Sequence, residues 1–157
     1  MKALHTQIGL ACLLFVAAVL PVRAQATEML VVVVASSLRI TDISSGTLRR
    51  VFTGYMTEVG GHRLIPVNHP PHSQARSRFD RAVLGLGPEE IGRFWVDRRI
   101  RDEGQPPKTV PSAELAVRLA ASLPGVITYA RPDSLNSQVR ALTVDGMKPG
   151  DQGYPLR

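Results

Sequence analysis

The sequence contains little cysteine and few aromatic residues. Its 157 residues include one cysteine, Cys12, and one tryptophan, and aromatic residues make up 5% of the chain. Cys12 lies within an N-terminal apolar run, so disulfides, cysteine-based metal sites and thiol nucleophiles are excluded beyond residue 26. A lipidated cysteine would stand at the end of such a run, so we do not expect a lipoprotein. The folded part of the chain must therefore be held together by its core alone.

The motifs of catalysis and metal binding are also missing. Beyond residue 26 the histidines are His62, His69 and His72, and none has the spacing of a zinc-binding helix. His69 and His72 lie in a proline-rich turn without a third ligand nearby in sequence, so solvated loop histidines are the simpler interpretation. Ser73 lacks the flanking glycines of a nucleophile elbow, and no glycine-rich nucleotide loop occurs. We therefore predict no enzyme activity, no cofactor and no metal.

The net charge is only mildly positive. The chain has 19 basic and 13 acidic residues, and without Lys2 and Arg23 the numbers are 17 and 13. The basic residues are scattered along several predicted helices, and aromatic residues do not alternate with them. This pattern is a poor match for a nucleic-acid-binding surface, so we expect no nucleic-acid partner. An affinity for small anions is the more economical inference.

The N-terminus is typical of a secretory signal peptide. Lys2 provides a positive charge, residues 8–20 form an unbroken apolar run of thirteen residues, and small residues follow at Ala24 and Ala26. The run is shorter than the roughly 20 residues that span a bilayer, so an uncleaved membrane anchor is the weaker alternative. We predict a signal peptide over residues 1–26, cleaved after Ala24 or Ala26, and a periplasmic or secreted protein.

The remaining residues, 27–157, predict one α/β domain. The run MLVVVVA at 29–35 has no polar alternation, which is typical of a strand buried on both faces, as in a parallel sheet covered by helices. Strands alternate with helices along the rest of the chain, which favours a small, mostly parallel sheet flanked by helices. The further strands are expected at 64–67, 126–130 and 139–144, and the helices from about 47, 73, 89 and 112. The tail 148–157, rich in glycine and proline, is expected on the surface.

Helical spacing predicts which apolar side chains face the core. In the helix 89–100 the expected inward residues are Ile91, Phe94 and Trp95, with Val96 as a further candidate. The position of Ile91 favours Trp95 over Phe94 as the more deeply buried residue. In the other helices the expected inward residues are Leu48, Val51, Phe52, Tyr55, Ala75, Phe79, Ala82, Val83, Leu86, Leu115, Ala116, Leu119 and Ala120.

The stretch LIPVNHPPHSQARSRF, residues 64–79, is the candidate binding site. It reads as a short strand, a proline-rich turn and a helix that opens at Ser73, a favourable N-cap residue. The free N–H groups and the dipole of a helix N-terminus attract anions. Four basic side chains gather at the same corner: His69, His72, Arg76 and Arg78. The alternative interpretation is an ordinary helix start with solvated basic residues.

Three stretches together resemble the phosphate-binding subunit of ABC transporters, a type II periplasmic binding protein. They are SSGTLRRVFTGYMTEVGGHRLIPV at 44–67, PGVITYA at 124–130 and LTVDGMKPGDQGYPLR at 142–157. The resemblance extends over roughly residues 29–157 and matches the second lobe and the crossing segments of the two-lobed family. It implies a single lobe of the type II periplasmic-binding-protein fold. A lone lobe cannot enclose a ligand by hinge closure within one molecule.

The resemblance also implies a set of ligand-binding residues. The family pattern Val-x-Arg-x-Asp-Gly-Ser-Gly-Thr-Thr-x-x-Phe aligns without a gap from residue 67 to residue 79. The serine is kept as Ser73, whereas His69 replaces the arginine, and Gln74 and Ala75 replace the glycine and threonine. A permanent cation is thus exchanged for a group with a reference pKa of about 6.5. Arg76 could compensate, because it lies nearer to the helix N-terminus than Arg78. The implied ligand-binding residues are Ser73, His69, Gln74, Ala75 and Arg76.

Two functions are compatible with these observations. The first is an exported solute-binding-protein-like domain that binds phosphate or a similar oxyanion, with an affinity that rises from about pH 8 to pH 6 as His69 gains a proton. The second is an interaction module without a ligand, docking on a membrane sensor or transporter. The loss of the family's arginine, glycine and threonine from the loop favours the second function. The retained Ser73 with its basic neighbours favours the first.

Overall fold

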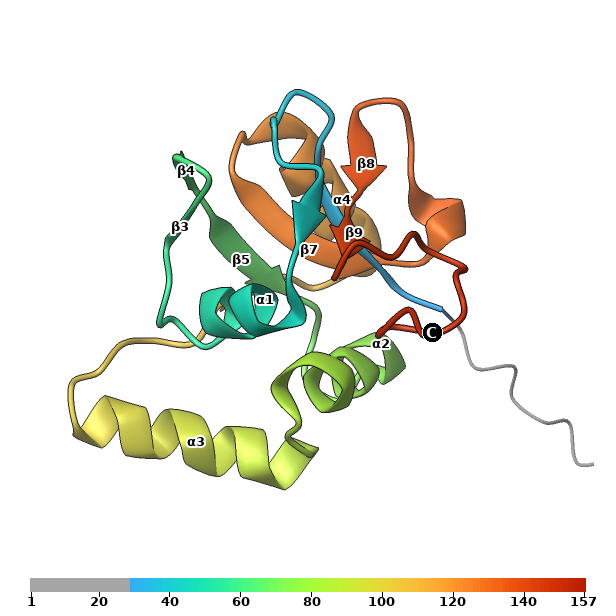
Figure 1. Ribbon diagram of the computed structural model, residues 1–157. Coiled ribbons are helices and arrows are strands. Elements are labelled where there is room, and N and C mark those ends of the chain that lie inside the picture. Colours follow the sequence, from blue (N-terminus) through green and yellow to red (C-terminus); the bar gives the residue numbers. More distant parts are fainter. Residues whose placement is uncertain (1–28) are drawn as a thin grey trace, which may run out of the picture.

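The computed structural model describes residues 29–157, so the predicted signal peptide lies outside the described residues. A five-stranded sheet forms the centre of the molecule (Figure 1). Its strands, in spatial order, are β6 (Lys108–Thr109), β5 (Ile65–Asn68), β7 (Val126–Ala130), β1 (Val31–Ala35) and β8 (Val139–Ala141).

The central sheet is mixed. Strand β5 runs parallel to β6 and to β7, whereas β1 runs antiparallel to both of its neighbours, with Val33 opposite Thr128 and Ala141. All five residues of β1 are buried, as the apolar run predicts. The burial on both faces comes from the helices that cover the sheet, and it does not require parallel neighbours. The predicted α/β fold, a small sheet flanked by helices, is confirmed.

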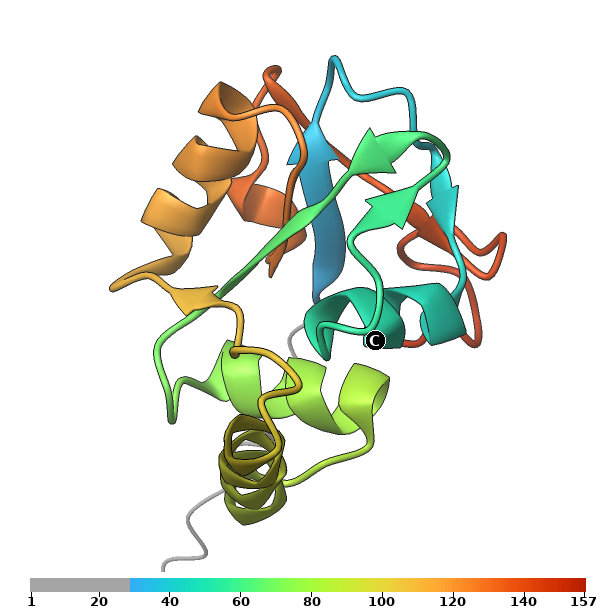
Figure 2. The ribbon, with the colours of Figure 1, turned by 90° about the vertical axis from the view of Figure 1, so that its left-hand side faces the viewer.

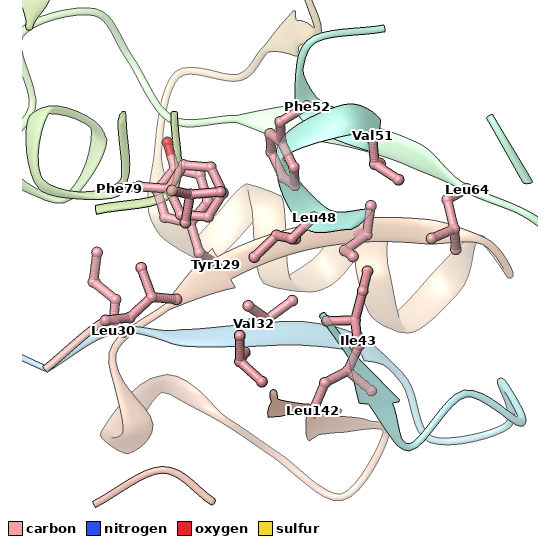
Figure 3. Close-up of a cluster of buried hydrophobic side chains, with 14 of the residues drawn as sticks. Leu30, Val32, Ile43, Leu48, Val51, Phe52, Leu64, Phe79, Tyr129 and Leu142 are labelled. Carbon is pink, nitrogen blue, oxygen red and sulfur yellow. The ribbon is translucent and has the colours of Figure 1, made fainter. Parts of the chain in front are cut away.

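Helices cover both faces of the sheet, as Figure 2 shows for α4 and α1. The helical elements are α1 (Ser45–Phe52), α2 (Gln74–Phe79), the π-helical turn η1 (Asp80–Leu84), α3 (Pro88–Ile100), α4 (Ala113–Ser122) and the short 3₁₀ turn η2 (Pro132–Ser134). Val31 and Val33 pack with Ala116 and Ala120 of α4 in one core. The alternate side chains of β1 form a second, larger core with α1, α2 and η1 (Figure 3).

Smaller strands close the edges of the fold. Strand β2 (Asp42–Ile43) pairs in parallel with β9 (Thr143–Val144), and β3 (Glu58–Val59) forms a hairpin with β4 (His62–Arg63). The hairpin turn is the predicted Gly60-Gly61 pair, with φ angles of 57° and 76° that favour glycine. The predicted last strand, 139–144, is divided between β8 and β9, which belong to different sheets.

Three predicted inward residues face solvent. Val96 is 51% exposed, because it lies on the side of α3 away from Ile91 and Trp95. Tyr55 is 58% exposed, because α1 ends at Phe52 and Gly54 adopts a φ of 76°, so helical spacing no longer places it. Ala82 is exposed because it lies in η1, where a wider π turn takes more residues per turn than an α-helix. The wider turn brings Leu84 into the core, at 2% exposure.

The C-terminal tail lies mostly on the surface, as predicted, but two of its side chains are buried. Tyr154 and Leu156 are only 2% and 0% exposed, and the carbonyl of Leu156 accepts a hydrogen bond of 2.9 Å from the amide of Leu30. Glycine and proline shape the tail into turns, and the apolar side chains between them still fill the core. The tail is therefore part of the fold.

Helix α3 has the predicted orientation. Ile91 and Trp95 are 8% and 6% exposed, whereas Phe94 is only partly buried and meets Trp95 edge-on. Arg98, near the end of the helix, is 3% exposed, and its guanidinium carbon lies 4.0 Å from the centre of the Tyr55 ring. Within residues 29–157, no helix is long and apolar enough to cross a membrane.

Candidate functional site

The predicted helix start at Ser73 is confirmed. The Ser73 hydroxyl accepts a hydrogen bond of 3.2 Å from the backbone N–H of Arg76, and Ser73 itself has extended backbone angles, as an N-cap residue does. The turn before it places His72 at a φ of 68°, with its side chain exposed. The Ser73 hydroxyl oxygen therefore accepts a hydrogen bond within its own helix, and its O–H remains available as a donor.

A cavity of about 110 Å³ lies beside this helix start. It is lined by Leu30, His69, Gln74, Ala75, Arg78, Ala113, Glu114, Arg131 and Ser134. These residues come from the ends of the parallel strands β5 and β7, from the segment before β1, and from the first turns of α2 and α4. A crevice outside the carboxyl ends of parallel strands is the usual ligand position in α/β folds. We call it the α2–α4 cavity.

Two helix N-termini meet at the α2–α4 cavity. Gln74 and Ala75 begin α2, and Ala113 and Glu114 begin α4. Ser112 caps α4 by accepting a hydrogen bond of 3.2 Å from the N–H of Leu115, just as Ser73 caps α2. The N-termini place two sets of N–H groups and two positive dipole ends at one cavity, which makes it attractive for an anion.

Two arginines line the α2–α4 cavity. Arg78 belongs to α2 and has no ion-pair partner within residues 29–157. Arg131 follows β7 and forms a salt bridge of 2.7 Å with Asp133, in which both side chains are at least half exposed. The cavity therefore has cationic groups from two elements that are far apart in the sequence.

Arg76 lies on the other side of α2. Its Nε donates a hydrogen bond of 2.6 Å to Oδ2 of Asp80, and the side chains are 11% and 5% exposed. Both residues line a separate cavity of about 250 Å³ together with Trp95. The sequence favoured Arg76 over Arg78 because of its distance from the helix N-terminus. That argument overlooked Asp80, the acidic residue one helical turn further on, which holds Arg76 away from the α2–α4 cavity.

His69 is buried in an aromatic stack. Its ring lies 4.3 Å from the ring of Tyr129, which in turn stacks on Phe79 at 4.0 Å, as Figure 3 shows for the last two residues. The His69 amide donates a hydrogen bond of 3.4 Å to the Tyr129 hydroxyl, and the hydroxyl donates one of 3.3 Å to Asn68. At 2% exposure, His69 is one wall of the cavity rather than a mobile side chain.

Burial changes the expected charge of His69. Desolvation is the largest effect and lowers the pKa of His69 from its ordinary value of 6.5. A hydrogen bond to the Tyr129 backbone acts in the opposite direction, followed by the charge of Arg76, which lowers the pKa, and that of Glu114, which raises it. Its Nε2 has no hydrogen-bond partner among the described residues. The predicted gain of a proton between pH 8 and pH 6 is therefore corrected, because the lowered pKa moves protonation to more acidic conditions.

Glu114 places a carboxylate at the same cavity. A hydrogen bond from its own backbone N–H and another from the Ser112 hydroxyl lower the pKa of Glu114 below its usual range. It is thus ionised at neutral pH. The sequence did not single out Glu114, because an acidic residue in the first turn of a helix is ordinary compensation of the helix dipole. It also did not single out Leu30, Arg131 and Ser134, which only the folding of the chain brings to the cavity.

The structure thus brings some of the implied ligand-binding residues together. His69, Gln74 and Ala75 line the α2–α4 cavity, Ser73 caps the helix beside it, and Arg76 lies elsewhere. Among the described residues, no group of three or more histidine, cysteine, aspartate or glutamate side chains could hold a metal ion.

The fold is similar to that of solved phosphate-binding proteins, although no protein-family model matches the sequence and no curated protein matches it. A phosphate ABC transporter substrate-binding protein from Clostridium perfringens, solved with bound phosphate, has a TM-score of 0.64 at 16% identity over 78% of this chain. An ABC-type phosphate transport receptor from Vibrio cholerae gives 0.62 at 17%, and PstS from Borrelia burgdorferi 0.59 at 18%, each over 78% of this chain.

The matched regions make up 47%, 48% and 49% of those three proteins, so the chain spans about half of their length. The likeness is one of fold, and it confirms at that level the resemblance that the three sequence stretches indicate.

Proposed function

We propose that this chain is a single-lobe solute-binding domain that holds phosphate or a similar oxyanion in the α2–α4 cavity. The observation that carries the proposal is the convergence of two capped helix N-termini and the Arg78 guanidinium on one cavity at the carboxyl ends of β5 and β7. The fold of the three solved proteins, one of which holds phosphate, supports the same ligand class.

The roles of the residues follow from their donors. The first-turn N–H groups that no hydrogen bond within the helix ends uses, those of Gln74, Ala75 and Ala113, donate to the anion, with Ala75 contributing only its backbone. Gln74 adds a side-chain amide, Ser73 adds its hydroxyl proton, and Arg78 supplies the charge-assisted hydrogen bond. His69, neutral at pH 7, serves as a hydrogen-bonding wall rather than as a cation.

Glu114 determines which oxyanion is preferred. An ionised carboxylate repels a fully deprotonated anion but accepts a hydrogen bond from an anion that still carries a proton. Phosphate keeps at least one proton near neutral pH, whereas sulfate keeps none. The cavity should therefore prefer phosphate to sulfate, and the Glu114→Gln variant should reduce this preference because an amide can donate to either anion.

The decisive experiment is isothermal titration calorimetry with sodium phosphate and sodium sulfate on the protein purified from an exporting host. We expect weak phosphate binding, because one lobe leaves the ligand partly open to water, and weaker sulfate binding. Arg78→Ala should weaken phosphate binding by roughly tenfold or more, as expected for one charge-assisted hydrogen bond. Arg81→Ala, which removes an exposed arginine outside this cavity, is the matched control and should bind normally. The absence of binding of either anion at millimolar concentration would overturn the proposal.

The location and partner proposed with this function are the periplasm and a membrane transporter. The solved proteins of similar fold are named as transport receptors and substrate-binding proteins of ABC transporters, which supports both in general terms. A periplasmic location also requires the predicted cleavage after Ala24 or Ala26. Mass spectrometry of the protein from its native host should find an N-terminus at residue 25 or 27, and an intact Met1 would contradict it.

A second candidate function is an interaction module that docks on a membrane sensor or transporter without binding a solute. One observation favours it: a buried neutral histidine stands where the family pattern has an arginine. A calorimetric titration without heat, together with phosphate-independent binding to a purified transporter or sensor, would select this function over the first.

A further inference from the structure

Helix α3 is apolar on two opposite faces. Its inner face contains Ile91 and Trp95, which are 8% and 6% exposed. Its outer face contains Val96 and Ile100, which are 51% and 78% exposed. Figures 1 and 2 show that α3 lies beyond α2, outside the layers that cover the sheet. An amphipathic surface helix needs only one apolar face, so the outer face requires its own explanation.

The outer apolar residues form a continuous stripe. Gly92, Val96 and Ile100 follow one another at four-residue spacing, which places them on one side of a helix. Apart from the neighbouring residues and the backbone of α3 itself, no described atom lies within 4 Å of the position that a Cβ would occupy at Gly92, so another helix could approach the backbone there. The stripe and its charged neighbours line a shallow groove along α3.

Charged residues alternate along one edge of the stripe. This edge carries four charged side chains at four-residue spacing, and their signs alternate: Glu89, Arg93, Asp97 and Arg101. Because their number is even, the two ends of the series carry opposite charges. Within the chain, Asp97 and Arg101 already form an ion pair, in which the side chains are 61% and 55% exposed. Such an exposed pair contributes little to stability and can exchange partners at little cost.

An alternating series of this kind is complementary to its own reverse. When two copies of α3 lie antiparallel about a two-fold axis, the same edge of each helix faces the other. Arg93 then lies opposite the partner's Asp97, and Glu89 lies opposite the partner's Arg101. In a parallel two-fold arrangement the same edge of the two helices would lie on opposite sides of the interface, so the charge series could not meet its own complement.

We propose that the outer face of α3 is an interface between two copies of this chain, paired antiparallel about a two-fold axis. Gly92, Val96 and Ile100 form its apolar seam, and the alternating charges fix its direction. A two-fold interface requires each surface to complement a second copy of itself, and this charge series does so. An unrelated partner would place no such requirement on the chain, so the charges favour a second copy. The proposal does not depend on anion binding in the α2–α4 cavity.

The size of the helix sets the expected strength of the dimer. Thirteen residues at 1.5 Å each give a contact about 20 Å long, which corresponds to an interface below the standard size of roughly 1,600 Å². We therefore expect a weak dimer with a dissociation constant between roughly 10 µM and 1 mM. Added salt should weaken it, because its edge charges are exposed.

The first test is sedimentation equilibrium on the exported protein over a concentration series up to about 1 mM. We expect a monomer–dimer equilibrium in the wild type and a loss of association by roughly tenfold or more in Ile100→Asp, because two apolar contacts per dimer are lost. Leu123→Asp is the matched control, because Leu123 is a 49% exposed apolar residue away from α3, and it should leave the equilibrium unchanged. Circular dichroism verifies that each variant is folded.

The second test exchanges the charges. Arg93→Asp and Asp97→Arg should each weaken the dimer by roughly fivefold, since each replaces two attractive contacts with two repulsive ones. The double variant should restore wild-type association, and an equimolar mixture of the two single variants should form a heterodimer. A wild-type protein that stays monomeric at 1 mM, or an association unaffected by Ile100→Asp and by the charge exchange, would overturn the proposal.

Discussion

The two sides of the segment formed by α2 and η1 present the same kind of residue in different chemical settings. On one side, Arg78 lines the α2–α4 cavity of about 110 Å³, beside the buried His69. On the other side, Arg76 is held by Asp80 at 2.6 Å in a cavity of about 250 Å³. The two arginines are two residues apart, so helical geometry turns them to different faces. Proximity to a helix N-terminus is therefore a poor guide to which cation can reach a ligand.

Burial explains why the Arg76–Asp80 pair is structural. Desolvation raises the pKa of Asp80 above its ordinary value, and the Arg76 guanidinium acts in the opposite direction. Oδ1 of Asp80 has no hydrogen-bond partner among the described residues. The Arg76–Asp80 pair therefore mainly offsets the free-energy cost of burying the two charges. Removing either side chain leaves the other charge buried without a partner, which destabilises the fold.

The largest effect on stability is expected from Trp95→Ala, because Trp95 lines the cavity of about 250 Å³ together with Arg76 and Asp80. Truncation of a buried aromatic side chain should lower the free energy of unfolding by about 3–5 kcal/mol, measured by urea denaturation. Phe94→Ala, at the partly buried neighbouring position, should lower it by clearly less. A larger loss in Phe94→Ala than in Trp95→Ala would show that the interior of α3 has been assigned to the wrong residue.

Arg76→Ala and Arg78→Ala separate the two sides directly. Arg76→Ala leaves the Asp80 carboxylate buried and unpaired, which should destabilise the protein by about 3 kcal/mol, the lower end for breaking a buried pair. Arg78→Ala should change the free energy of unfolding by less than about 1 kcal/mol, since it breaks no ion pair within residues 29–157. Thermal denaturation and phosphate titration of both variants check the comparison. If Arg76→Ala folds as stably as the wild type but no longer binds phosphate, the two roles have been exchanged.

The N-caps of the α2–α4 cavity should have a smaller effect. Ser73→Ala and Ser112→Ala each remove a hydrogen bond of 3.2 Å to a backbone N–H, and each should lower the free energy of unfolding by about 1 kcal/mol. Replacement by threonine keeps a capping hydroxyl and should recover most of that loss. Chemical denaturation provides the measurement, and equal stability of the alanine and threonine variants would argue against a capping role.

The smallest expected effect is the contribution of His69 to the pH dependence of stability. Because burial lowers the pKa of His69, the unfolded chain takes up the proton more readily than the folded one. Its contribution to stability is therefore complete above the ordinary pKa of 6.5 and is lost as the pH falls toward the lowered value. His69→Gln should remove this part of the pH dependence, and denaturation of both proteins at about pH 7.5 and pH 5.5 measures it. A wild type that gains stability relative to the variant on acidification would contradict the sign.

Local patterns in the sequence predicted the elements well. The valine-rich run predicted β1, and the serine caps predicted the starts of α2 and α4, because both features depend on a few neighbouring residues. The four-residue spacing between Ile91 and Trp95 gave the orientation of α3 for the same reason. The similarity of the fold to the solved phosphate-binding proteins agrees with the three sequence stretches that resemble them.

The composition of the candidate site could not be predicted in the same way. Leu30, Glu114, Arg131 and Ser134 come from three distant segments, and only the order of the strands brings them to the cavity. The π-helical turn at η1 changes the helical phase, which no spacing rule for α-helices anticipates. The burial of Tyr154 and Leu156 in the C-terminal tail likewise results from tertiary packing that the glycine and proline content of the tail obscures.

The position of β1 in the sheet has a kinetic consequence. It is the first strand of the described chain, yet its residues pair with β7 and β8, which follow roughly 100 residues later. Pairing β1 with such distant strands requires closing a long loop, and the chain loses the entropy of loop closure before the strand contacts form. Folds dominated by such non-local pairs form slowly. Strand β1 therefore stays unpaired during synthesis until β7 has been made, and its second edge waits for β8. A chain with this topology cannot complete its five-stranded sheet until most of it has been synthesised, so translation is nearly finished before the fold can form.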